Sequence, residues 1–247
     1  MANKTEKPKL TYFFIIICII VFLLEYYFRY YYGEDFLNYI FSNYGFSLQN
    51  LLNGKVWVPL TSIFLHADPS HLIFNMIALY FFGKVVEQNL GRKKFLITFF
   101  ASGFIADMFV IASDFIGFSS ATVPTIGASA AIFGLMGIAM VTKPLELIFY
   151  PYLIPIPLVL VAFIYTLYNI STFLLVLTGQ TSSNVSYVSH IGGIISGLFM
   201  GFTEKSKKGF IIIIFILALL LTTPFVIILI NILENFNYIN ILSGFFK

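Results

Sequence analysis

The chain has 247 residues, of which 59% are hydrophobic, 19% aromatic and only 10% charged, and its mean hydropathy is +0.93. Soluble domains carry about 25% charged residues, so this composition excludes a water-soluble globule. The net charge of +3 and the high apolar content also exclude a nucleic-acid-binding protein and a disordered chain. The single cysteine, Cys18, excludes a disulfide scaffold and a cysteine-based zinc site. The sequence therefore predicts a polytopic membrane protein.

Seven apolar segments are long enough to cross a bilayer, which takes about 20 mostly apolar residues in a helix. Four are expected at about residues 10–28, 71–86, 95–112 and 122–141. Two more lie within residues 147–203, which contain no Asp, Glu, Lys or Arg and are divided by polar residues at 179–184; the last lies at 209–233. Because these runs are long and continuous, they indicate helices and not the short alternating strands of a barrel.

The distribution of Lys and Arg predicts which side of the membrane each end faces, because these residues accumulate on the cytoplasmic side. The smaller group consists of Arg29, Lys55 and Lys247. With seven spans, 11 of the 14 basic residues fall on the side of the N-terminus: Lys4, Lys7, Lys9, Lys84, Arg92, Lys93, Lys94, Lys143, Lys205, Lys207 and Lys208. The N-terminus is therefore expected in the cytoplasm. The second, fourth and sixth spans then begin near the outer face.

A histidine and two glycines share one face at the start of the sixth span. At about 100° per residue, His190, Gly193 and Gly197 align along a helix. Small residues at this spacing let a neighbouring helix approach closely, which would hold the imidazole against that helix and away from lipid. Ionisable groups within spans are costly and indicate function, although an interhelical hydrogen bond alone also explains a histidine here.

A serine stands at the beginning of the fourth span, in the sequence Gly127-Ala128-Ser129. Ala130 and Gly134 form a second pair of small residues on one helix face. Free backbone N–H groups and the helix dipole favour negative charge at a helix start, which suits a serine that attacks a carbonyl group. A helix N-cap or a packing serine is the structural alternative.

His71 and Asn75 lie four residues apart at the start of the second span, hence on one helix face. Both side chains can donate hydrogen bonds to a developing oxyanion, and capping of the helix start is the structural alternative. A metal site built from His66, His71 and His190 is the competing arrangement. His66 and His71 have a poor spacing for one helix face and no His-Glu-x-x-His motif occurs, so neither a metal nor another cofactor is expected.

Together these three spans supply a hydroxyl nucleophile, an imidazole base and two oxyanion donors at one predicted depth, which are the groups that a serine hydrolase requires. Three motifs resemble those of the rhomboid intramembrane serine proteases, in the same order and on the same spans. They are Gly-x-Ser ending at Ser129, His-x-x-Gly-x-x-x-Gly starting at His190 and His-x-x-x-x-His-x-x-x-Asn starting at His66. The resemblance covers about residues 10–202.

The resemblance implies that Ser129 is the nucleophile and His190 its general base, a dyad without an acid partner. It also implies that His71, Asn75 and the backbone N–H of Ser129 form the oxyanion hole. Four further residues would support the site by close packing or stacking: Gly127, Phe133, Gly193 and Gly197.

The chain departs from the family pattern at four positions. Ala130 stands where the family has a glycine after the serine, and Ser189 where it has an alanine before the histidine. Phe133 stands where the family often has a tyrosine stacked on the catalytic histidine. Val58 follows Trp57, where the family has an arginine in a Trp-Arg loop motif. A Glu-x-x-x-Gly motif that the family uses in structural contacts is present at Glu87 and Gly91.

The fold implied by the resemblance is all-α: a six-helix rhomboid-like catalytic core over residues 1–203 and, over residues 204–247, a basic cytoplasmic loop, a seventh transmembrane helix and a short outer tail. The expected activity is serine endopeptidase cleavage of transmembrane segments of single-span or other membrane proteins near the outer face, with no nucleic-acid partner. The expected location is the plasma membrane, with the site open to the extracytoplasmic side. The fifth span, with Pro151, Pro155 and Pro157 near its inner end, is the expected gate for substrates.

Two other functions are consistent with parts of the sequence. A catalytically inactive rhomboid-like protein would bind transmembrane segments without cutting them, but such proteins usually lack the serine or the histidine. A seven-helix transporter would show internal repeats and helices broken at mid-membrane, and the sequence has no such repeat.

Overall fold

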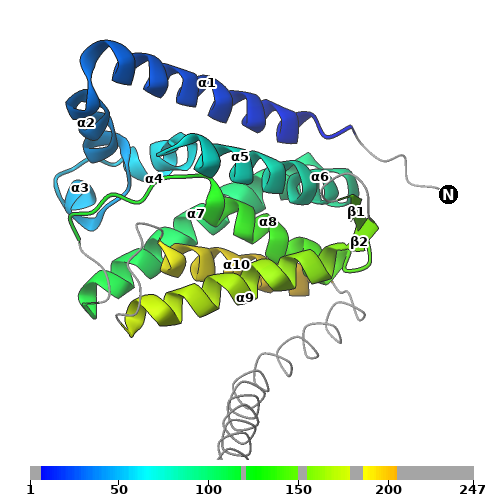
Figure 1. Cartoon of the computed structure of the whole chain (residues 1–247). Helices are drawn as coiled ribbons and strands as arrows, with labels where there is room; N and C mark the ends of the chain where they lie inside the picture. The colour runs from blue at the N-terminus through cyan, green and yellow to red at the C-terminus, as the bar shows by residue number, and fades with distance from the viewer. Residues whose placement is uncertain (1–6, 118–120, 150–154, 179–185, 205–247) are drawn as a thin grey trace, which may run out of the picture.

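The structure is a computed structural model that describes residues 7–117, 121–149, 155–178 and 186–204. Its helices lie in a bundle with one small hairpin at the side (Figure 1). The main elements in chain order are α1 (Lys9–Tyr32), α2 (Glu34–Tyr44), α3 (Leu48–Leu52), α4 (Val58–Thr61), η1 (Ser62–Phe64), α5 (Pro69–Ala78), the π-helical turn η2 (Leu79–Gly83), α6 (Lys84–Leu90), α7 (Arg92–Phe115), α8 (Ser129–Thr142), β1 (Leu147–Phe149), β2 (Pro155–Pro157), α9 (Leu158–Leu177) and α10 (Tyr187–Thr203).

Four of the described helices are long and apolar enough to cross a membrane: Lys9–Tyr32, Pro69–Leu90, Arg92–Phe115 and Leu158–Val176. The second of these is continuous from α5 through η2 to α6. The shorter apolar helices α8 and α10 lie within the remaining two expected spans of the core. The basic loop and seventh span expected over residues 204–247 lie outside the described residues, apart from Glu204.

Helix α8 lies at the centre of the bundle (Figure 1), because its sequence is apolar on all sides and a helix of that kind is stable only when it is surrounded. Ten of its 14 residues are buried. The helix begins at Ser129, seven residues after the start expected for the fourth span, so the expected start at residue 122 was wrong. At about 1.5 Å per residue α8 is about 21 Å long, shorter than a hydrocarbon core of about 30 Å.

Glycines bring α10 into backbone contact with α8. A Cβ atom on Gly197 would lie 2.0 Å from the carbonyl oxygen of Gly134, and one on Gly193 would lie 2.2 Å from the carbonyl oxygen of Ala130. Only glycine allows so close an approach. The small-residue faces expected on the fourth and sixth spans therefore lie against each other.

A buried carboxylate holds α1 against α6. Glu87, which is fully buried, accepts hydrogen bonds from the N–H groups of Leu10 (2.9 Å) and Thr11 (2.8 Å) and from the Thr11 hydroxyl (2.8 Å). The first N–H groups of a helix have no partner within the helix, and the dipole favours a negative charge there. Glu87 thus caps α1 from a neighbouring helix.

The prolines expected near the inner end of the fifth span lie outside its helix. Pro155 and Pro157 belong to β2, which pairs antiparallel with β1, and α9 begins at the next residue, Leu158. Proline can precede a helix without loss of a hydrogen bond, whereas inside a helix it removes one. Pro151 lies outside the described residues. The expectation that Pro155 and Pro157 belong to the fifth helix was therefore wrong.

We expect Gly197→Ala to destabilise the protein by about 3 kcal/mol, because the added methyl group meets a backbone carbonyl that cannot rotate away. Thermal unfolding in detergent micelles measures the effect. Ile195→Ala, on an exposed position of the same helix, serves as the control and should cost less. An unfolding midpoint of Gly197→Ala equal to that of the wild-type protein would contradict the backbone contact.

Candidate active site

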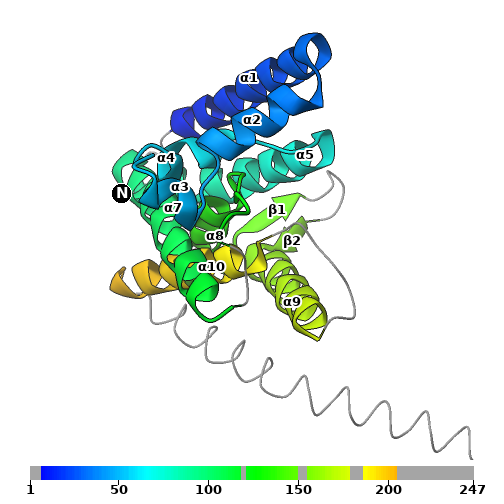
Figure 2. The ribbon, with the colours of Figure 1, turned by 90° about the vertical axis from the view of Figure 1, so that its left-hand side faces the viewer.

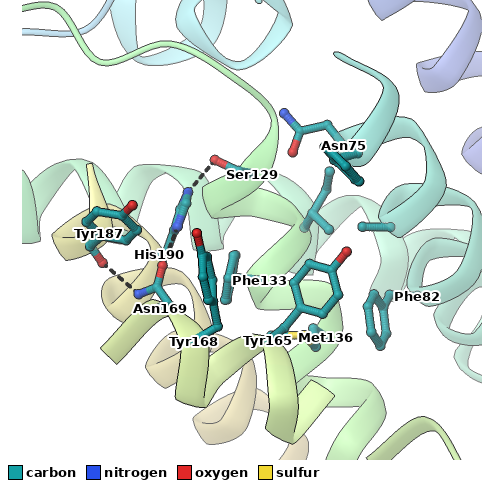
Figure 3. Close-up of a pocket in the computed structure, with 13 residues that line it drawn as sticks. Asn75, Phe82, Ser129, Phe133, Met136, Tyr165, Tyr168, Asn169, Tyr187 and His190 are labelled. Atoms are coloured by element: carbon teal, nitrogen blue, oxygen red, sulfur yellow. Dashed lines mark hydrogen bonds between the residues drawn. The ribbon is translucent and has the colours of Figure 1, made fainter. Parts of the chain in front are cut away.

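The first residue of α8 and the fourth residue of α10 are in hydrogen-bond contact. Ser129 Oγ lies 2.6 Å from His190 Nε2 (Figure 3). Ala128, not Ser129, is the N-cap residue of α8, so the serine is not used to cap its helix. The contact follows from the close packing of the two helices, which brings their N-terminal ends together.

Two aromatic rings and one amide surround the imidazole of His190. The ring of Phe133 is stacked on it, with centroids 4.5 Å apart and an interplanar angle of 12°, and Tyr187 packs edge-on at 6.2 Å. The Nδ1 atom of the imidazole lies 2.6 Å from Oδ1 of Asn169 on α9. Sequence reasoning missed Asn169; an amide within an otherwise apolar span was the signal that could have identified it.

Asn75 on α5 lies on the other side of Ser129 from His190 (Figure 3), and His71, one turn earlier on α5, also approaches the entrance to α8. A Cβ atom on Gly127 would lie 2.6 Å from Nε2 of His71 and 3.5 Å from Nδ2 of Asn75, so both side chains approach the backbone just before the serine. The Nδ2 atom of Asn75 is buried and has no hydrogen-bond partner within the described part of the chain. An unsatisfied buried donor is costly, so this group is free to bind an oxygen of a ligand.

Residues 121–128 carry the chain to Ser129 without helical structure, and their backbone groups are held by other segments. Thr125 and Phe46 exchange two backbone hydrogen bonds of 2.7 and 2.9 Å, and the Gly127 N–H donates to the Ser62 carbonyl at 2.8 Å. Gly127 has a φ of +115°, which other residues rarely adopt. The segment thereby fixes where α8 begins.

The segment before α5 contains an acidic residue that caps the helix and a buried histidine. Asp68 accepts a hydrogen bond from the Ser70 hydroxyl and another from the His71 N–H at 2.9 Å, which together hold the pKa of this carboxyl below its usual range. Asp68 thus provides the capping that was the structural alternative for His71 and Asn75. His66 is only 1% exposed, and its burial lowers its pKa to about 4, so the ring is neutral at physiological pH and packs edge-on against His71 at 5.1 Å.

Lys55 anchors the loop that contains Trp57 and leads into Val58, the first residue of α4. Its ammonium group donates hydrogen bonds to Oδ1 of Asn43 (2.9 Å) and Oδ1 of Asn50 (3.0 Å), and the Trp57 indole donates to the Asn43 carbonyl at 3.0 Å. Val58 is fully buried. A lysine three residues earlier therefore provides a cation in this loop, where the sequence motif has no arginine.

A cavity of about 200 Å³ opens beside Ser129 and His190, between α5, α8 and α9 (Figure 3). Apart from Ser129, His190 and the two amides, its lining is apolar or aromatic: Phe74, Ala78, Phe82, Ile132, Phe133, Met136, Tyr165, Tyr168 and Tyr187. Within the described ranges no three His, Cys, Asp or Glu side chains gather in a way that could hold a metal ion. The cavity can accept an apolar segment next to a hydroxyl, an imidazole and a free amide donor.

A family model described as the rhomboid domain matches residues 53–207, which is more than half of the chain. The chain belongs to the rhomboid family. With its apolar helices, this makes it an integral multi-pass membrane protein.

Relatives include the rhomboid protein YdcA of Bacillus subtilis (strain 168), 31% identical over 166 residues, which are 66% of this chain and 74% of YdcA. RHOMBOID-like protein 12, mitochondrial, of Arabidopsis thaliana is 27% identical over 63% of this chain and 48% of its own length. Rhomboid protease GluP of Bacillus subtilis (strain 168) is 30% identical over 60% of this chain and 26% of its own length. An Arabidopsis thaliana relative that is 34% identical over 85 residues is named Inactive RHOMBOID-like protein 8. The chain spans less than two thirds of the length of the mitochondrial relative and of GluP.

We expect Gly127→Ala to displace His71 and to slow the modification of Ser129 by a fluorophosphonate by about 10²-fold, because the new methyl group would lie 2.6 Å from the imidazole. The labelling rate is measured in detergent by mass spectrometry. Gly117→Ala is the matched control: φ is +76° there, but no atom lies within 4 Å of the added Cβ. If Gly127→Ala and Gly117→Ala were labelled at the same rate, contact between the new methyl group and His71 would not affect the labelling rate of Ser129.

Proposed function

We propose that this protein is an intramembrane serine protease in which Ser129 is the nucleophile and His190 the general base. The observation that carries the proposal is the 2.6 Å contact between Ser129 Oγ and His190 Nε2 beside an apolar cavity. A serine is a weak nucleophile at neutral pH unless an adjacent base takes its proton, and a contact of this length allows that transfer. Membership of the rhomboid family adds support.

In the proposed reaction, Ser129 Oγ attacks the carbonyl carbon of a peptide bond while its proton passes to His190 Nε2. The carbonyl oxygen takes up the negative charge. When the C–N bond breaks, His190 gives the proton to the leaving amine and an acyl-enzyme ester remains. A water molecule, deprotonated by the same imidazole, then hydrolyses the ester and restores the Ser129 hydroxyl.

The developing oxyanion is proposed to bind His71, Asn75 and the backbone N–H of Ser129. The N–H groups in the first turn of a helix lack partners within the helix, and Ser129 is the first residue of α8. The free Nδ2 of Asn75 is a second donor on the same side. Donors that are already oriented before reaction stabilise the transition state without the cost of reorganisation.

The site is proposed to open to the extracytoplasmic side of the plasma membrane. The bias of Lys and Arg towards the side of the N-terminus supports this orientation. With the N-terminus in the cytoplasm, the N-terminal ends of α5, α8 and α10 are expected near the outer face. Hydrolysis needs water, which is almost absent from the bilayer core, so a site near helix ends is favoured. We extend the proposal to a catalytic core over residues 1–203 and a seventh transmembrane helix within residues 204–247.

Substrates are proposed to be transmembrane segments of single-span or other membrane proteins that enter between α5 and α9, the helices on either side of the cavity. A helical segment hides its peptide bonds, so sequences with Gly, Ala or Pro that unwind easily are favoured. The apolar lining fits such segments better than charged peptides.

We expect Ser129→Ala to abolish cleavage of a single-span substrate reconstituted with the protein in liposomes. Products are identified by mass spectrometry. Ser196→Ala is the control, since it removes a buried hydroxyl from α10 that bonds only to Ser102 at 3.1 Å in the described structure. Cleavage by Ser129→Ala at the wild-type rate would overturn the proposed function.

Asn75→Ala is expected to lower kcat by about 10²–10³-fold and to leave KM nearly unchanged, because the lost donor acts on charge that develops only in the transition state. Asn75→Asp, which keeps the shape but loses the N–H donor, should show a similar loss. Steady-state kinetics with a fluorogenic substrate measure kcat and KM separately. A wild-type kcat for Asn75→Ala would remove this side chain from the proposed oxyanion hole.

A second candidate, binding of transmembrane segments without cleavage, is suggested by the relative named inactive. The presence of both Ser129 and His190 in hydrogen-bond contact argues against it. Rapid labelling of Ser129 by a fluorophosphonate would favour the protease.

A further inference from the structure

Asn169 is a buried amide at the end of an apolar stripe on α9. The buried positions of this helix are Leu158, Val161, Ala162, Thr166 and Asn169, which follow one helix face. Asn169 is only 3% exposed, although it is the most polar member of the stripe. A buried amide is costly unless its donors and acceptor find partners, so its contacts require a physical explanation.

The nitrogen and the oxygen of the Asn169 side-chain amide both form hydrogen bonds with residues of α10. Its Nδ2 donates to the Tyr187 carbonyl at 3.2 Å, and its Oδ1 lies 2.6 Å from Nδ1 of His190 (Figure 3). Besides Tyr187 of its own helix, the catalytic imidazole is contacted by two other helices: by Asn169 from α9, and by Ser129 and the stacked Phe133 from α8.

The chemistry of these groups sets the direction of each hydrogen bond. The Tyr187 carbonyl can only accept, so the NH₂ group of Asn169 faces it and Oδ1 faces His190. An amide oxygen can only accept as well, so Nδ1 of His190 must carry a proton. In the neutral imidazole the other nitrogen, Nε2, is then unprotonated and accepts the hydrogen bond from Ser129.

We propose that Asn169 is a positioning residue that holds His190 in the tautomer and ring orientation needed for a general base. This inference rests on the proposed function of Ser129 and His190. A neutral imidazole with its proton on Nε2 cannot take the serine proton, so the tautomer decides whether the base is competent. Phe133 fixes the plane of the ring but has no atom that can accept a hydrogen bond from Nδ1.

The helix that carries Asn169 also borders the substrate cavity and lies at the edge of the bundle (Figure 2). Ser129 and His190 lie on the closely packed pair α8 and α10, so these two helices stay together when α9 is displaced. The same displacement removes Oδ1 of Asn169 from Nδ1 of His190. The base is therefore fully oriented only when α9 is docked on α10.

Asn169→Leu tests this directly. We expect kcat for a single-span substrate to fall by about 10²-fold with KM changed less than about threefold, because the tautomer affects the chemical step. Asn169→Asp, which keeps an acceptor for Nδ1–H, should recover at least about tenfold of that loss when measured above neutral pH. Thr166→Val removes another buried polar group from α9, one that bonds only to Ala162 in the described structure, and should leave kcat unchanged.

The tautomer itself is read by ¹⁵N NMR of the histidine rings in detergent. The chain has only three histidines, so the His190 signals are assigned by comparison with His190→Ala. The wild-type protein should show the proton on Nδ1, and Asn169→Leu should lose this preference. A proton on Nε2 in the wild-type protein would overturn the inference even if the Asn169 variants fail to fold.

Three further outcomes are distinguishable. If Ser129→Ala is inactive but Asn169→Leu has wild-type kcat and unchanged ring signals, the positioning role is wrong and the proposed function stands. If Asn169→Leu and Thr166→Val lose kcat equally, Asn169 is only a structural link between helices, and the positioning role is again wrong. If Ser129→Ala still cleaves, the proposed function fails, which no result on Asn169 alone would show.

Discussion

Where α8 and α10 cross, two glycines of α10 lie directly on backbone carbonyl groups of α8, with no side chain between them. Lipid tails are as apolar as leucine, so the hydrophobic effect does little to hold membrane helices together and close van der Waals contact has to do it. The same separation places Ser129 Oγ 2.6 Å from His190 Nε2. A larger side chain at either glycine would move the helices apart by more than a hydrogen bond tolerates. Stability and the serine–histidine contact thus depend on one packing arrangement.

The shortness of α8 is a second constraint, and it concerns water. A helix of about 21 Å cannot cross a core of about 30 Å, so the chain reaches Ser129 through the irregular residues 121–128. Non-helical backbone at membrane depth is tolerated only where protein or water satisfies its polar groups. Here Phe46 and Ser62 provide backbone partners. The same irregular entry leaves the first N–H groups of α8 free, in the place where the proposed reaction develops negative charge.

Composition and periodicity were enough to predict the four long apolar helices of the described structure and the faces on which α8 and α10 pack. Continuous apolar runs identified the spans, and small residues at a spacing of four identified the contact between α8 and α10. The fourth span was assigned from residue 122, although Ser129 was expected near the helix start. Pro124 and Gly127 interrupt residues 122–128, and backbone hydrogen bonds to Phe46 and Ser62 hold this stretch outside the helix, so α8 begins at Ser129. Pro155 and Pro157 were assigned to a helix because a strand of three residues is too short to show a period. Asn169 was missed since a single amide in an apolar run does not say which side chain it will meet.

Asn169 shows why a dyad in the sequence is an incomplete description of the geometry. Ser129 and His190 can be paired by motif, but the side of the imidazole that faces away from the serine has to be paired as well, because a ring nitrogen without a partner leaves the tautomer unspecified. The partner here is neutral, so it orients the ring without adding charge to a low-dielectric interior, where an unpaired carboxylate would be costly. It also comes from α9, the helix that borders the cavity. A segment that wedges α9 away from α10 to enter would break both bonds of this amide, and the ring would regain its orientation only after α9 returned. In the proposed protease, a substrate would therefore enter while α9 is displaced from α10, and His190 would become a competent base only after α9 has returned.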